Sequence, residues 1–92
     1  MKSIVQADEN RCFVCGSQRG LEYHHIMHGT ANRRLSTRYG LTCYLCYLHH
    51  RGRFGVHSDA DMNRRLQKVA QKAFEDIHGH EAWMAVFKKN YL

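Results

Sequence analysis

The sequence predicts a small α+β domain, in which a β-hairpin and a short helix come first and a helical part follows. Two observations predict it. The first half holds two short segments of strand-forming residues, each beside closely spaced cysteines, whereas apolar residues recur at helical spacing from Asp59 onward. At 92 residues the chain has the length of one domain. We expect a single domain over 1–92, with the hairpin unit at 11–58 and a helical extension at 59–92.

The first half begins with a short polar lead-in over 1–10. A knuckle from Cys12 to Cys15 follows, and Gly16 and Gly20 after it permit tight turns. Residues 21–26 then predict a first strand, because Leu21, Tyr23 and Ile26 are strand formers.

A polar loop is predicted over 29–37, and a second strand over 41–45 that can pair with the first as a hairpin. After Cys46 the chain should turn into a short helix, which Gly52 and Gly55 limit. The histidines of this segment would then be held on a compact scaffold.

From Asp59 the spacing predicts a helix over about 60–78, with Ser58 or Asp59 as N-cap and Gly79 as the stop. A second short helix is expected over about 81–88. The apolar stripe of the longer helix, expected to pack on the hairpin, comprises Met62, Leu66, Val69, Ala70, Ala73, Phe74 and Ile77.

The cysteines and histidines of the first half have the spacing of a metal site. Cys12 and Cys15 can reach one ion from a tight turn, and a second pair about thirty residues on closes a tetrahedral zinc site. That second pair is either Cys43 with Cys46 or Cys46 with His49. A chain this short buries only about 60 to 65% of its unfolded surface, so a metal clip is the expected reinforcement.

The N-terminus has no apolar run long enough for a signal peptide, and no segment approaches the length of a membrane span. We expect an intracellular, cytoplasmic protein without a membrane partner. In a reducing compartment, cysteines in this spacing are more often metal ligands than disulfides, and a thiol redox protein would not need the nearby histidines.

Positive charge is concentrated in the half that carries these motifs. Lys and Arg number 14 against 8 acidic residues, and 1–58 holds 8 of the basic residues but only 3 of the acidic ones. A basic surface around a metal site favours a polyanion such as nucleic acid.

Three segments together resemble the HNH endonuclease family. They are Cys12 to Cys15, Tyr23-His24-His25-Ile26 and Leu45-Cys46-Tyr47-Leu48-His49-His50. The resemblance covers roughly 11–58 and implies a zinc-bound, treble-clef-like ββα-metal motif. The chain is also similar to small HNH-type proteins of phages and prophages, in its Gly29 to Arg34 loop and its Asn90-Tyr91-Leu92 end. A phage protein is therefore a further expected partner.

The resemblance also favours one set of zinc ligands. In the family, the functional histidine directly follows the last zinc ligand. This indicates that Cys12, Cys15, Cys46 and His49 hold the structural zinc, that Cys43 is a small apolar strand residue, and that His50 is free for chemistry.

Further roles follow from the resemblance. It implies that His24 and His50 hold a catalytic divalent metal (Mg²⁺, Mn²⁺ or Ni²⁺) and that His25 is the general base that deprotonates the attacking water. Asn32 alone lies in the interval where the family carries its middle Asn. His28 and His57 are interpreted as structural or solvent-facing.

The function implied is metal-dependent hydrolysis of DNA phosphodiester bonds, by an endonuclease or nickase. Arg33, Arg34, Arg51 and Arg53 flank the site and are expected to contact phosphates. The alternative is a non-catalytic zinc module that binds DNA or a protein partner. Two features favour this alternative: the displaced Asn and the small size of the chain.

Overall fold

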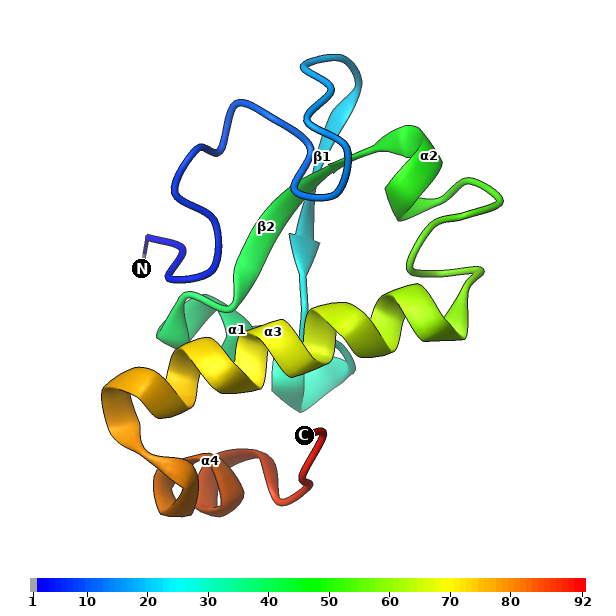
Figure 1. Cartoon of the computed structure of the whole chain (residues 1–92). Coiled ribbons are helices and arrows are strands. Elements are labelled where there is room, and N and C mark those ends of the chain that lie inside the picture. The colour runs from blue at the N-terminus through cyan, green and yellow to red at the C-terminus, as the bar shows by residue number, and fades with distance from the viewer. Residues whose placement is uncertain (1) are drawn as a thin grey trace.

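The computed structural model describes residues 2–92; Met1, the first residue of the expected lead-in, lies outside them. The described chain forms a two-stranded sheet with four helices, which confirms the α+β class (Figure 1). In chain order these elements are β1 (Leu21–His25), α1 (Thr30–Tyr39), β2 (Thr42–Cys46), α2 (Tyr47–His50), α3 (Ala60–His78) and α4 (His80–Phe87).

The hairpin forms as expected. β1 and β2 pair antiparallel, with Tyr23 opposite Tyr44 and His24 opposite Cys43. The N-terminal segment runs beside the other edge of β2. There the buried Gln6 side chain accepts a hydrogen bond from the Tyr44 backbone N–H (2.8 Å), and the Ser3 hydroxyl donates to the Thr42 carbonyl (2.6 Å). These bonds satisfy backbone groups that an edge strand would otherwise expose.

The prediction of a polar loop over 29–37 is wrong, because this stretch lies almost entirely in helix α1. The helix has few apolar residues to reveal it; Ser36 is its only buried residue, and Leu35 and Tyr39 pack partly buried against the core. The Ser36 hydroxyl donates to the Met27 carbonyl (2.7 Å) and accepts from the Met27 N–H (3.0 Å), so a polar contact docks the helix. Gly40 ends it with a left-handed φ of 71°.

Helix α3 has the predicted bounds and the predicted Asp59 cap, whose carboxylate accepts from the N–H groups of Asp61 and Met62. It crosses in front of α1 and one end of the sheet (Figure 1). The predicted apolar stripe is too wide, because Val69 and Ile77 are 39% and 58% exposed. The buried side chains of α3 are Leu66, Ala70, Gln71 and Phe74.

The short C-terminal helix α4 starts and ends one residue earlier than expected and buries Trp83 and Phe87. Trp83 packs edge-on against Phe74 of α3, with ring centroids 5.4 Å apart. These aromatic rings join α4 to the core that lies under the hairpin. No helix within residues 2–92 combines the length and the apolar character needed to cross a bilayer.

Candidate metal centres

Four ligand atoms converge where the knuckle meets the start of α2. They belong to Cys12, Cys15, Cys46 and His49, and all lie within 4.8 Å of one another. The knuckle turns tightly because Gly16 takes a φ of 80° and donates its N–H to the Cys12 carbonyl. The Phe13 N–H bonds the Tyr44 carbonyl and holds the knuckle against β2.

The distances fit a tetrahedral ion. Two sulfurs about 2.3 Å from zinc lie about 3.8 Å apart, and a sulfur and an imidazole nitrogen about 3.6 Å apart. The Sγ atoms of Cys15 and Cys46 are 3.8 Å apart. Nδ1 of His49 lies 3.3 Å from Sγ of Cys46 and 3.9 Å from Sγ of Cys12. The group could therefore bind a metal such as zinc.

The thiols differ in their readiness to ionise. Burial raises the pKa of Cys12, but backbone hydrogen bonds at Cys46, Cys15 and Val14 outweigh it and lower that pKa to about 6. The thiolate, which is the metal-binding form, is thus accessible at neutral pH. Burial, with the nearby Cys12, raises the pKa of Cys43 to about 12, and its sulfur lies outside the group. Cys43 behaves as an apolar strand residue.

A second group of ligand atoms comprises His24, His50 and His57, again within 4.8 Å of one another. Their rings stand roughly edge to face, with centroids 4.7 to 5.6 Å apart. The sequence singled out His24 and His50 for a metal, and the structure brings these two together. It adds His57, which was interpreted as structural or solvent-facing.

The loop between α2 and α3 brings His57 to this group. The loop folds back so that the N–H groups of Val56 and His57 bond the carbonyls of His49 and His50. Glycine permits this approach: a Cβ at Gly55 would lie 2.7 Å from the His50 carbonyl atoms, and one at Gly52 would lie 2.8 Å from the Leu48 backbone. The two glycines were the only sequence signal for this turn, and nothing in the spacing gave its direction.

Glu22 fixes the orientation of His50. Its carboxylate oxygen lies 2.8 Å from Nδ1 of His50, and since a carboxylate only accepts, Nδ1 carries the proton. The pKa of Glu22 is lowered, chiefly by this hydrogen bond. Nε2 of His50 then presents its lone pair, 3.1 Å from Nε2 of His57. Two nitrogens about 2.1 Å from one ion lie about 3.0 to 3.4 Å apart, so the pair fits shared ligation.

His24 supplies the third nitrogen from the buried end of β1. Its side chain is only 3% exposed, and within residues 2–92 its Nε2 is the sole buried side-chain nitrogen or oxygen without a hydrogen-bond partner. Burial, and then the neighbouring imidazoles, lower its pKa to about 3. A neutral, buried, unpartnered imidazole nitrogen has the chemistry of a metal ligand.

His25 follows His24 at the end of β1. Adjacent strand residues face opposite sides, yet both lie in the lining of one hollow of about 240 Å³. We call this the histidine hollow; it is lined by Tyr23, His24, His25, His28, Arg33, His50, Arg51 and His57. His25 shares its face of β1 with Tyr23, whose ring lies 5.0 Å away and also lines the hollow.

Thr37 of α1 fixes the tautomer of His25. The Thr37 hydroxyl donates its single proton to the Arg33 carbonyl (3.2 Å), so it accepts from Nε2 of His25 (3.0 Å). Nδ1 of His25 therefore keeps a lone pair. Burial and then the Arg33 charge lower the pKa of His25, which favours the neutral form. A helix that the sequence did not predict thus orients the expected general base.

The expected DNA-contacting arginines separate into two pairs. Arg33 and Arg51 line the histidine hollow, and Arg51 also approaches Glu22 (3.3 Å). Arg34 lines a different depression on α1, and Arg53 lies exposed on the following loop with its guanidinium over the Phe54 ring.

The expected middle asparagine, Asn32, lies in the first turn of α1 and does not line the histidine hollow. A different asparagine reaches it. Oδ1 of Asn63 on α3 lies 3.1 Å from Nε2 of His28, which does line the hollow. Since Asn63 lies 35 residues beyond His28, only the tertiary fold reveals this contact.

Comparison with protein-family models, curated proteins and solved structures finds no match to this chain.

Proposed function

We propose that this protein is a metal-dependent endonuclease or nickase of HNH type that hydrolyses DNA phosphodiester bonds. One observation carries the proposal: His24, His50 and His57 converge beside His25 in a single hollow, on a scaffold that a Cys₃His group would clamp. A purely structural zinc module does not require a buried imidazole outside the zinc site, such as His24, whose Nε2 has no hydrogen-bond partner.

The chain's own residues would divide the work. His24, His50 and His57 would hold the divalent ion, with Glu22 orienting His50. When bound, such an ion supplies positive charge that binds the scissile phosphate and stabilises the leaving oxygen. With three imidazole ligands the site favours Mn²⁺, Ni²⁺, Co²⁺ or Zn²⁺ over Mg²⁺.

His25 would act as the general base. Its neutral ring has Nδ1 available, because Thr37 keeps the proton on Nε2, and Nδ1 would accept a proton from the attacking water. Arg33 and Arg51 would bind the non-bridging oxygens of the phosphate at the rim of the hollow.

A plasmid-relaxation assay with Mg²⁺, Mn²⁺, Ni²⁺ and Co²⁺ tests the proposal. We expect metal-dependent nicking by the parent and a loss of about 10² to 10⁴ in rate for His25→Ala, with zinc content and circular dichroism unchanged. His80→Ala is a matched control, since His80 is an exposed imidazole far along the chain that bonds Glu75. A parent that never nicks, or a His25→Ala variant that nicks at full rate, would eliminate the nuclease.

A non-catalytic zinc module is the second candidate, and one observation favours it. Tyr47, Leu48 and Phe54 are 62%, 47% and 55% exposed around α2, beside the Cys₃His group. Exposed apolar side chains of this size are typical of partner-binding surfaces. The same assay discriminates, because a module of this kind binds without cutting.

A further inference from the structure

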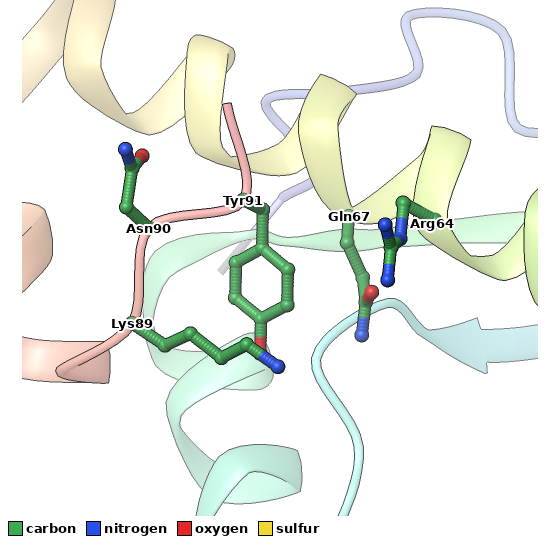
Figure 2. Close-up of a pocket in the computed structure, with 5 residues that line it drawn as sticks. All are labelled: Arg64, Gln67, Lys89, Asn90 and Tyr91. Atoms are coloured by element: carbon green, nitrogen blue, oxygen red, sulfur yellow. The ribbon is translucent and has the colours of Figure 1, made fainter.

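A second polar hollow lies where the C-terminal tail runs against α3 (Figure 2). Arg64 and Gln67 line it from the helix, and Lys89, Asn90 and Tyr91 line it from the tail. We call it the tail hollow. Its volume is about 140 Å³, whereas sites for drug-sized ligands begin near about 300 Å³. It has room for one small polar group.

The lining of the tail hollow is rich in donors and contains no acidic side chain. Among residues 2–92, Arg64 and Lys89 take part in no ion pair. Nζ of Lys89 lies 5.1 Å from the centre of the Tyr91 ring, so the ammonium is held over that ring. Two cations, the Gln67 amide and the Tyr91 phenol are together suited to bind an anion.

The tail is fixed in place by a buried glutamine. Gln71 is fully buried; its Nε2 donates to Oδ1 of Asn90 (2.8 Å), and its Oε1 accepts from the Tyr91 N–H (2.7 Å). The indole N–H of Trp83 also donates to the Lys89 carbonyl (2.8 Å). These bonds hold the backbone of the tail in position before any ligand arrives, which lowers the entropic cost of binding.

The two hollows lie along the same side of α3. Asn63, which bonds His28 in the histidine hollow, is four residues before Gln67, so these side chains lie on one helix face about 6 Å apart along its axis. Successive phosphates of a DNA strand advance by about 3.4 Å. A DNA strand that binds in the histidine hollow and follows this face of α3 would present further phosphates to the tail hollow.

Positive charge also gathers elsewhere on the exposed surface of α3. Arg65 and Lys68 line a neighbouring depression with Arg64, where Asp61 is the one acidic residue. From the sequence, the excess positive charge is assigned to 1–58, because in the second half the acidic residues nearly cancel the charge of the basic ones. The fold instead gathers three of those cations in this depression, and Arg64 also lines the tail hollow.

We propose that the tail hollow binds a backbone phosphate of DNA, away from the phosphate that is cut. The inference rests on the proposed function for the identity of the polyanion. It requires only that DNA binds, and not that the protein cuts it. It makes Arg64 and Lys89 phosphate-contacting residues, and Gln71 the residue that positions Lys89 by fixing the tail against α3.

Binding of a DNA duplex over a series of salt concentrations tests the inference, with cutting disabled by His25→Ala. Neutralising one phosphate contact changes the log–log salt slope by about 0.9. We expect Arg64→Gln with Lys89→Gln to reduce the slope by about that amount. Lys2→Gln with Arg19→Gln is the matched control, since it removes two exposed charges from the N-terminal segment and the knuckle loop. Equal slopes for both double variants, or no change in the first, would overturn the inference.

Two further arms separate the causes. Asn90→Ala, which breaks the Gln71 contact without changing charge, should weaken DNA binding at constant net charge; parental affinity would contradict a prearranged tail.

Titration with inorganic phosphate, followed through the amide resonances of Asn90 and Tyr91, distinguishes the phosphate source. Shifts there without any effect on the DNA slope would assign the hollow to free phosphate and overturn the proposal. A reduced slope in a protein that never nicks would eliminate the nuclease and leave this inference standing.

Discussion

Nε2 of His50 and Nε2 of His57 lie 3.1 Å apart, although the two residues are seven positions apart and a glycine-rich loop intervenes. The Gly55 backbone passes so close to the His50 carbonyl that any side chain there would collide with it. The geometry of the second metal group therefore depends on a position that carries no ligand.

Gly55→Ala should weaken binding of the second ion without removing the first. The added methyl group pushes the loop from α2 and moves His57 out of reach, so affinity for Mn²⁺ or Co²⁺ should fall by at least the 10- to 100-fold that is typical of losing a supporting contact. Calorimetry on zinc-loaded protein measures it. Gly29→Ala is the control, because a Cβ there has no neighbour within 4 Å, although its positive φ adds strain. Unchanged affinity in Gly55→Ala would mean that His57 is not a ligand.

Cys46→Ser should lose zinc and unfold the first half of the chain, because zinc binding contributes on the order of 10 kcal/mol to small metal-bound folds. Cys43→Ser should keep one zinc per chain and cost only about 1 to 3 kcal/mol, for a buried hydroxyl. Metal analysis and thermal melts check both. Zinc lost from Cys43→Ser but retained in His49→Ala would favour four cysteines.

Acid should destabilise the fold through His24. Its pKa is about 3 when folded and 6.5 ordinarily, so the unfolded chain binds the extra proton and stability falls as pH drops below 6.5. Between about pH 7.5 and about pH 5 this loss is about 2 kcal/mol. Urea unfolding of protein with one equivalent of zinc measures it, with His24→Gln as reference. If both proteins lose stability equally over this range, His24 is not the buried neutral group described above.

Thr37→Val should reduce the cutting rate by about tenfold, since it removes an orienting hydrogen bond of about 1.5 kcal/mol from His25. Thr37→Ser should restore most of the rate, because it keeps the hydroxyl. Both variants should bind DNA like the parent. Equal rates for the Val and Ser variants would show that the tautomer of His25 is not set by this contact.

Arg33→Ala should reduce the salt slope of DNA binding by about 0.9, whereas Arg34→Ala should change it less, because only Arg33 lines the histidine hollow. Fluorescence anisotropy on a duplex measures both. A larger effect of Arg34 would place the DNA on the outer side of α1.

The sequence predicts what depends on local spacing. The helix from Ala60 to His78, its Asp59 cap and the pairing of β1 with β2 follow from periodicity and turn residues. Helix α1 escapes prediction because few of its residues are apolar: Leu35 and Tyr39 pack partly buried against the core, and Ser36 docks the helix by hydrogen bonds. The Gly40 cap after Arg38 and Tyr39 was the available signal.

The sites divide in the same way. Cys12, Cys15, Cys46 and His49 come as two local pairs, so their spacing alone indicates a shared ion once the pairs meet. His57 joins the histidine hollow through a loop reversal, and Thr37 and Asn63 contact His25 and His28 of its lining from α1 and α3. No pattern of residue types encodes such contacts, because they depend on how distant elements are placed.

His49 and His50 are consecutive residues of one four-residue helix, and each faces a different group of ligands. With both groups loaded as proposed, a general chelator would strip the two ions together and abolish the proposed activity for two unrelated reasons. Inhibition by such a reagent carries no information about catalysis in this protein. Exchange of the second ion must instead be performed with the zinc left in place, and reconstitution must supply zinc first.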